Sequence, residues 1–235
     1  MQDKNKKIAI VQSSYIPWRG YFGLISAVDE FVLFDDMQFT KRDWRSRNKI
    51  KTANGSVWLT VPVQVRGKYH QRIMDTLVSD VKWRKKHWNS VKMNYAKSPF
   101  FKDYGSIFEN LYLGSEEKKL STINYKFIIE ICKILDIDTK ISWSTDYETS
   151  EDRSERLASI AEQANGSVYI SGPAAKEYMD LSCFENKGIE VQWADYSNLK
   201  EYPQLYGEFE SQVSVLDLIF NCGKDARKYI SIDAI

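Results

Sequence analysis

Apolar and polar positions alternate in blocks at the start of the chain. Residues 7–11 form a short apolar run, residues 17–28 follow a helical pattern with a proline in the first turn, and residues 31–34 form a second apolar run. A strand, a helix and a strand of these lengths fold most readily into a right-handed crossover between parallel strands. We therefore expect an α/β fold with a Rossmann-like, mostly parallel sheet flanked by helices.

The middle of the chain is predicted to be mainly helical. Residues 57–63 are rich in β-branched residues and predict one strand, whereas the charged and aromatic residues 37–51 predict no regular element. Three helices are predicted at residues 83–95, 106–113 and 121–135. They define a mainly helical insertion at about residues 81–136 of a single domain that spans residues 1–235. Further strands are predicted at residues 140–144, 168–170 and 189–193, and further helices at residues 152–164, 176–179 and 214–220.

The balance of charges excludes some classes of partner. The 33 basic and 32 acidic residues give a net charge of +1, so no global field attracts nucleic acid or an anionic membrane. The three cysteines lie far apart and form neither a zinc-binding nor a disulfide pattern. No apolar stretch is long enough for a signal peptide or a membrane-spanning helix. We expect a cytoplasmic protein with no membrane insertion and no nucleic-acid partner.

The sequence QSSYIPWRGYF follows the first predicted strand directly. Gln12 can present an amide at the strand end, Pro17 fixes the start of the helix, and Gly20 allows a close backbone approach. The free N–H groups of the first helical turn would then face an anion such as a phosphate. The alternative is that this turn serves packing. Its anchors would then be Tyr15, Trp18, Tyr21 and Phe22.

Two acidic residues end the second predicted strand, at the same edge of the expected sheet. Asp35 and Asp36 could hold Mg²⁺ with substrate phosphates, or one of them could act as a general base. The segment QFTKRDWRSRNKIK follows and adds Arg45 among its cations for an anionic ligand. The residues assigned to substrate binding in this segment are Gln38, Trp44, Arg47, Asn48 and Lys49. The alternative is a solvated loop of ion pairs.

The chain has only two histidines, His70 in a predicted loop and His87 on the predicted helix of residues 83–95. His87 shares a stripe of that helix with Trp83 and Tyr95. It is therefore either a buried structural residue or a group for proton transfer. Two distant histidines do not predict a metal site.

A second turn for a ligand is predicted where SGPAAKEYMD follows the strand of residues 168–170. The residues assigned to substrate binding in the C-terminal part are Ser171, Gly172, Tyr178 and Gln204. Asp217 and Asn221 share one face of the last predicted helix. Cys222 is either a nucleophile or a buried, inert thiol.

These segments together resemble the WbqC-like family over residues 8–223. In order, they read QSSYIPWRGYFGLISAVDEFVLFDDMQF, WRSRNKIK, WLTVPV, HWNSVKMNYAKSPFF, YISGPAAKEYMD, and YPQL with SVLDLIFNCG. That family typically has a proline after the glutamine of the first turn, where this chain has Ser13. The resemblance implies a place among bacterial genes for O-antigen and related surface polysaccharides. It also implies a part in decorating amino sugars with acyl or aminoacyl groups such as glycyl.

The first strand, turn, helix and strand are also similar to the front end of HxGH nucleotidyltransferases, including the pantothenate synthetase type. The histidines that stabilise the transferring phosphate in that superfamily are replaced in PWRGY. This likeness therefore implies the Rossmann-like architecture. A diverged nucleotidyltransferase stays an alternative.

The residues and the resemblance together predict an enzyme of surface polysaccharide biosynthesis. It would transfer an N-acyl or aminoacyl group to a nucleotide-linked amino sugar, with Asp36, His87 or Asp35 taking the proton from the amine. No tightly bound cofactor is predicted, and the donor is open among a carrier-protein thioester, coenzyme A and an acyl phosphate. The expected partners are the nucleotide-linked sugar and, for the first donor, an acyl carrier protein, while a homodimer is one open oligomeric form. The alternative from another class is a non-catalytic sugar-nucleotide binding or assembly subunit.

Overall fold

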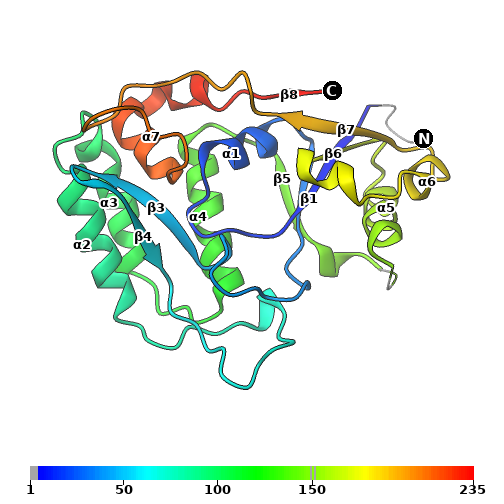
Figure 1. Ribbon diagram of the computed structural model, residues 1–235, viewed down its shortest axis with the longest axis horizontal. Helices are drawn as coiled ribbons and strands as arrows, with labels where there is room; N and C mark the ends of the chain where they lie inside the picture. Colours follow the sequence, from blue (N-terminus) through cyan, green and yellow to red (C-terminus); the bar gives the residue numbers. More distant parts are fainter. Residues whose placement is uncertain (1–4, 149, 151) are drawn as a thin grey trace.

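Parallel strands form the centre of the molecule (Figure 1). The computed structural model describes residues 5–148, 150 and 152–235. The strand order is β5-β2-β1-β6-β7-β8; β8 runs antiparallel to β7, and the other neighbouring pairs are parallel. The bounds are β1 (Lys7–Val11), β2 (Glu30–Leu33), β5 (Lys140–Trp143), β6 (Val168–Ser171), β7 (Glu190–Asp195) and β8 (Asp233–Ala234). This sheet confirms the expected Rossmann-like α/β architecture.

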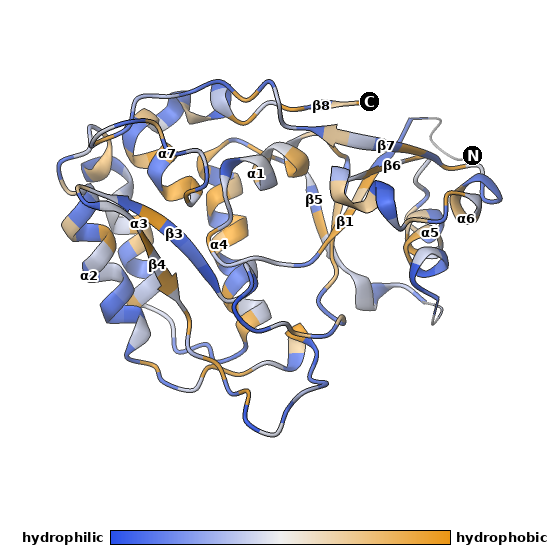
Figure 2. Ribbon diagram, viewed as in Figure 1, coloured by the Kyte–Doolittle hydropathy of each residue, from blue (hydrophilic) through white to orange (hydrophobic). Residues whose placement is uncertain are grey.

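The sheet buries apolar side chains on both faces. Phe31 and Leu33 belong to one apolar core, whereas Val32 and Phe34 belong to a second one, because successive side chains of a strand point to opposite faces. The first core includes residues of α1 (Arg19–Ser26), α4 (Leu120–Ile134) and α7 (Val215–Cys222), and the second includes residues of α5 (Arg153–Gln163) and α6 (Ser182–Glu185). In Figure 2 the apolar colour gathers on β1, α4 and α7 in the middle of the molecule. The helices therefore cover the sheet from two sides.

The segment between β2 and β5 contains a hairpin and three helices. The helices are α2 (Trp83–Tyr95), α3 (Phe101–Leu113) and α4. The hairpin consists of β3 (Arg47–Thr52) and β4 (Gly55–Thr60). The sequence predicts no element over residues 37–51, and this prediction is wrong. Asn48 and Ile50 are buried while Arg47 and Lys49 are partly exposed, so the apolar signal of β3 is limited to one residue.

Three C-terminal elements also differ from the prediction. A 3-10 helix at Pro173–Glu177 replaces the helix expected at residues 176–179. No helix was expected at α6 and no strand at β8, because elements of four and two residues carry no periodic signal. The other 3-10 helices are Ile73–Asp75, Ser144–Asp146 and Gly223–Tyr229.

Local residues mark both the start and the end of α5. Asp152 accepts a hydrogen bond of 2.8 Å from the N–H of Glu155 at the start of α5. Asn165 has a φ of 58°, the left-handed conformation that ends the same helix. Among the residues that the structure describes, no helix combines the length and the apolar character needed to cross a bilayer.

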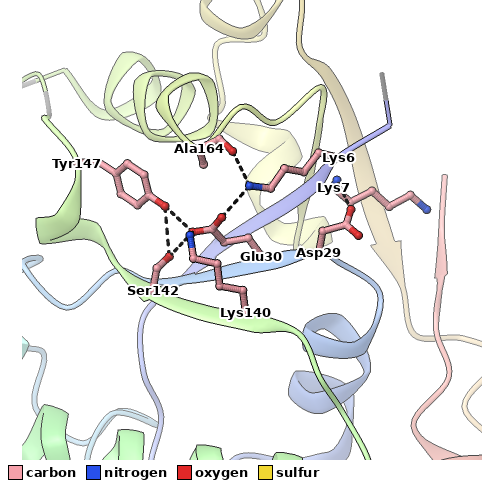
Figure 3. A network of polar contacts seen from close by, with 8 residues as sticks. All are labelled: Lys6, Lys7, Asp29, Glu30, Lys140, Ser142, Tyr147 and Ala164. Carbon is pink, nitrogen blue, oxygen red and sulfur yellow. Dashed lines mark hydrogen bonds and ion pairs between the residues drawn. The ribbon is translucent and has the colours of Figure 1, made fainter. Parts of the chain in front are cut away.

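Glu30 ties three strands together at the edge of the sheet where the parallel strands begin (Figure 3). Its carboxylate contacts the Nζ atoms of Lys6 at 2.8 Å and Lys140 at 3.0 Å. It also accepts hydrogen bonds from Ser142 Oγ at 2.7 Å and from the hydroxyl of Tyr147. Burial alone would raise the pKa of Glu30, but these hydrogen bonds together lower its pKa to about 2. This network is therefore a structural clamp at the edge away from the carboxyl ends of the strands.

Candidate functional site

A cavity of about 430 Å³ opens at the carboxyl ends of the parallel strands. The chain passes from β1 to β2 and β5 on one side, and β6 and β7 return on the other side of β1. The neighbours β1 and β6 therefore mark the topological switch point, where open α/β sheets bind ligands. Val11, Gly172 and Tyr196 reach the cavity from the ends of β1, β6 and β7. The fold thus places the cavity at the edge where the sequence predicts two ligand turns.

Aromatic rings form much of the cavity wall. Trp18 and Tyr21 come from the start of α1, Tyr196 follows β7, and Trp44 comes from the loop before β3. The ring centroids of Trp18 and Tyr196 are 5.1 Å apart. Trp44 also packs near Trp58, with ring centroids 5.3 Å apart. Such walls suit planar or sugar rings, which pack well against aromatic faces.

The polar part of the wall is centred on Arg45 and Ser14. The Nη1 atom of Arg45 donates a hydrogen bond of 2.8 Å to Ser14 Oγ, and both residues line the cavity. The Nε atom of Arg45 is buried and has no partner among the described residues. Asn124 holds the backbone of Arg45 by donating to its carbonyl oxygen at 2.9 Å. The pair is therefore a fixed guanidinium and hydroxyl, which suits a phosphate or another anionic oxygen.

Asp35 lies behind the cavity wall. Only 1% of the residue is exposed, and it accepts hydrogen bonds from the backbone N–H of Ser13 at 2.7 Å and from Ser13 Oγ at 2.6 Å. Ser121 Oγ donates to the same carboxylate from α4. Burial raises the pKa of Asp35, and the hydrogen bonds from the two serines oppose this rise. Asp35 therefore connects the turn that contains Ser14 with β2 and α4. Its carboxylate does not line the cavity.

Asp36 points to different partners from Asp35. Its carboxylate forms an ion pair with Arg156 of α5 and accepts a hydrogen bond of 2.5 Å from Ser144 Oγ. Consecutive side chains after a strand tend to point to opposite sides, so the two aspartates serve helices on opposite faces of the sheet. Asp36 does not line the cavity either.

His87 lies in the aromatic core between α2 and the hairpin. Its Nδ1 atom is 2.9 Å from the hydroxyl of Tyr15, and its ring packs 5.1 Å from the ring of Trp83. Burial lowers the pKa of His87 to about 4. The imidazole does not line the cavity. Of the two roles that the sequence leaves open, this position favours a buried structural residue over a group for proton transfer.

The other residues of the first turn divide between lining and packing. Pro17 lines the cavity, and the backbone carbonyl of Gln12 accepts a hydrogen bond of 3.2 Å from Tyr21. Tyr15 is fully buried. A Cβ atom at Gly20 would collide with the indole of Trp18, so this glycine allows the ring to lie over α1. The turn therefore serves packing and cavity formation at once.

Of the remaining assigned residues, few reach the cavity. Asn48 and Gly172 line it, and Ser171 lies one residue before Gly172 at the end of β6. Gln38 donates instead to the carbonyl oxygen of Tyr69 in an exposed loop, at 2.7 Å.

Three assigned residues form contacts elsewhere. Tyr178 packs under the guanidinium of Arg153, with 4.1 Å from the guanidinium carbon to the ring centroid. Arg47 and Lys49 lie over the ring of Trp58, on the outer face of the hairpin.

Gln204 belongs to a second buried polar network under α7. It accepts a hydrogen bond of 2.8 Å from Lys51 Nζ. Nearby, Asp217 is fully buried and accepts a hydrogen bond of 2.9 Å from the hydroxyl of Tyr95. Burial raises the pKa of Asp217 to about 6, although that hydrogen bond opposes the rise. This network joins the hairpin to α2 and α7.

Several lining residues were not assigned from the sequence to substrate binding. They are Val11, Ser14, Leu24, Tyr196 and Gln212, whereas Arg45 was expected only as one of the cations for an anionic ligand. Tyr196 follows a predicted strand at the same edge as the first turn, so the rule that identified that turn could also have identified this ring. Gln212 lies in a loop without a periodic pattern, and no sequence signal points to it.

Comparison with known proteins gives a family and no structural relative. No solved structure matches the chain significantly. The uncharacterized protein Rv1507c of Mycobacterium tuberculosis (strain ATCC 25618 / H37Rv) is 47% identical over 225 residues, which are 96% of this chain and 97% of that protein. The profile of the WbqC-like protein family matches residues 12–229, a span that includes the two turns and the hairpin beside the cavity. The chain therefore belongs to the WbqC-like protein family.

Proposed function

We propose that the cavity binds a nucleotide-linked amino sugar and that the protein is an N-acyl or aminoacyl transferase of bacterial surface polysaccharide (O-antigen) biosynthesis. The observation that carries the proposal is the combination of aromatic walls with the Arg45 and Ser14 pair at the switch point. Pockets for small ligands typically have volumes of about 300 to 1,000 Å³, and this cavity lies in that range.

Each part of the ligand has a complementary part of the wall. The diphosphate of a sugar nucleotide suits the guanidinium of Arg45 and the hydroxyl of Ser14, whose oxygen already accepts from the guanidinium and can donate its own proton to a ligand. Trp18 and Tyr196 offer aromatic surface to the base or the sugar ring. Recognition by charge and by ring packing would then occur within one cavity.

The transfer requires a neutral amine, because an ammonium group has no lone pair with which to attack. No Asp, Glu or His is among the described residues that line the cavity. A cationic guanidinium and an apolar wall both disfavour a charged ammonium group, so they lower the pKa of a sugar amine bound beside them. Under this proposal the cavity supplies a neutral amine through its electrostatics, and Asp35 acts as a positioning residue through Ser13.

The lack of an Asp, Glu or His among the described lining residues also favours a second candidate, a non-catalytic sugar-nucleotide binding or assembly subunit. The three acid or base residues expected from the sequence, Asp35, Asp36 and His87, are all engaged in contacts away from the cavity. A binding subunit would need the ring and phosphate contacts alone. Turnover separates the two candidates.

Gly172 provides a sharp test of the cavity. A Cβ atom at this residue meets no atom within 4 Å, and the backbone angles of φ −67° and ψ 149° are allowed for any residue. Gly172→Leu should fill the cavity from the end of β6 without strain, whereas Gly172→Ala should leave room for a ligand. Calorimetric titration with UDP- and dTDP-linked 4-amino sugars should therefore show binding to the wild type and to Gly172→Ala, and lost binding to Gly172→Leu.

Mass spectrometry of the sugar after incubation with acyl donors then distinguishes transfer from binding. A mass increase supports the transferase. Binding that Gly172→Leu abolishes, without any product, supports the binding subunit. If neither sugar nucleotide binds the wild type, or if all three proteins bind equally, the cavity assignment is wrong.

A further inference from the structure

A cationic and aromatic strip lies on the outer face of the β3–β4 hairpin. We define it by Trp44, Arg47, Lys49 and Trp58. The guanidinium carbon of Arg47 lies 4.0 Å from the centroid of the Trp58 ring, and the Nζ atom of Lys49 lies 5.4 Å from it. Lys49 and Trp58 are direct cross-strand partners, so they share one face of the hairpin. The ring of Trp44 extends this face, 5.3 Å from that of Trp58.

The strip is accessible, and its charges are not neutralised. Trp44 is 42% exposed and Trp58 is 39% exposed, which is unusual for residues of this size. Within the described part of the chain, neither Arg47 nor Lys49 forms an ion pair with a carboxylate. The Nε atom of Arg47 is buried and also has no hydrogen-bond partner there. Two cations beside two exposed indoles suit a ligand with both negative charge and a planar ring.

The strip is continuous with the cavity. Trp44 belongs to both, because it lines the cavity and also packs on Trp58. Arg45, the next residue, lines the cavity from the same loop. A ligand held along the strip would therefore have one end beside the cavity, where the proposed sugar amine would lie.

We propose that this strip binds the nucleotide part of a coenzyme A thioester, which is the acyl donor of the reaction. This inference rests on the proposed function and adds the class of donor. A nucleotide offers both chemistries at once, a purine ring for the indoles and several phosphate charges for Arg47 and Lys49. An acyl phosphate has no ring, and the arm of a carrier protein has a single phosphate and no base. The strip therefore selects coenzyme A among the three donors.

The transfer balances without a further reactant. The neutral amine nitrogen of the sugar attacks the thioester carbonyl carbon, a C–N bond forms, and the C–S bond breaks. The sulfur leaves with the electron pair of that bond and takes up the proton that the amine loses. The products are an N-acylated sugar and the free thiol of coenzyme A.

The test is a calorimetric titration of the full chain with coenzyme A, and separately with 4′-phosphopantetheine, adenosine 3′,5′-bisphosphate and inorganic phosphate. Coenzyme A and the bisphosphate should bind more tightly than the other two probes. Lys49→Gln and Trp58→Leu should each weaken coenzyme A binding by about tenfold, since a charge-assisted contact or a base stack contributes this much. Both side chains are partly exposed, so the variants should fold, and circular dichroism checks this.

Two further variants make the result specific. Lys176→Gln is the matched control, because Lys176 also lies over an indole, that of Trp193 at 5.6 Å, but outside the strip. It should bind coenzyme A as the wild type does. Gly172→Leu should lose the sugar nucleotide and bind coenzyme A as the wild type does. Trp58→Leu should bind the sugar nucleotide as the wild type does and coenzyme A about tenfold more weakly. Failure of the donor site and failure of the cavity are therefore distinguishable.

Three outcomes would overturn the inference. Coenzyme A binding no tighter than inorganic phosphate is the first, and equal losses in Lys176→Gln and Lys49→Gln are the second. The third is tight binding of a phosphopantetheine-loaded acyl carrier protein together with no binding of coenzyme A, which would assign the donor to the carrier-protein class.

Discussion

The Nη1 atom of Arg45 donates a hydrogen bond of 2.8 Å to Ser14 Oγ in the wall of the cavity. Ser14 follows β1, and Arg45 precedes β3, so this contact joins the edge of the sheet to the hairpin. The serine oxygen acts as an acceptor in it, which leaves the hydroxyl proton available to a ligand. The pair thereby combines structural and recognition roles, and substitution can separate them.

Arg45→Met should weaken binding of a UDP-linked sugar by about tenfold or more, because a hydrogen bond to a charged group contributes roughly 1.5–3 kcal/mol. Binding of uridine, which has no phosphate, should change little. Calorimetric titration with both ligands measures the difference. The exposed Arg66, which is not among the residues that line the cavity, provides the control Arg66→Met. Equal losses for the sugar nucleotide and for uridine would show that Arg45 only shapes the cavity.

Asp35→Asn tests whether the buried carboxylate is a positioning residue. The carboxylate accepts hydrogen bonds from Ser13 and Ser121, and an amide would turn an N–H group toward one of these donors. We expect the free energy of unfolding to fall by roughly 1–3 kcal/mol. Urea unfolding measures this, with the exposed Asp103→Asn as the control. Unchanged stability together with lost turnover would instead return Asp35 to a catalytic role.

The location of the candidate site was predictable from the sequence, for a clear physical reason. Apolar runs and a helix of suitable length specify a parallel crossover, and a parallel crossover places the loops after its two strands at one edge of the sheet. The turn that contains Trp18 and the loop that contains Trp44 indeed both line the cavity. The aromatic and proline residues of these loops gave the signal.

The direction of each side chain was not predictable in the same way. Asp35 and Asp36 are adjacent in sequence, yet one contacts α4 through Ser121 and the other contacts α5 through Arg156. Whether a carboxylate faces a cavity or a helix depends on residues that are distant in the sequence. The same holds for β3, where charged residues on the outer face conceal a strand whose inner face is buried. Local patterns do not contain this information.

His87 should make the protein less stable in weak acid. Burial lowers its pKa to about 4 from the usual 6.5. As the pH falls from 6.5 to 4, the unfolded chain binds a proton at this residue and the folded chain does not, so the free energy of unfolding falls. The shift corresponds to roughly 3 kcal/mol at most. Urea unfolding at several pH values should show this slope in the wild type and a smaller one in His87→Gln, which can keep a hydrogen bond to Tyr15. Identical slopes in the two proteins would contradict the assignment of a lowered pKa to His87.

Asp217 should act in the opposite direction over an overlapping range. Burial raises the pKa of its carboxyl group to about 6 from the usual 3.8. Between these values the folded chain holds a proton that the unfolded chain lacks, so the free energy of unfolding falls as the pH rises through this range. Asp217→Asn retains an acceptor for Tyr95 and removes the titration.

In the wild type the contributions of His87 and Asp217 therefore partly cancel between pH 4 and 6. Without the carboxyl group, the contribution of His87 stands alone, so the stability of Asp217→Asn should rise with pH more steeply than that of the wild type. Asp103→Asn, on the exposed side of α3, should follow the wild-type curve. A curve for Asp217→Asn that stays parallel to the wild type from pH 4 to 6 would mean that the buried carboxyl group titrates alike in the folded and unfolded chains, and that Lys51 and Tyr95 together offset the whole cost of its burial.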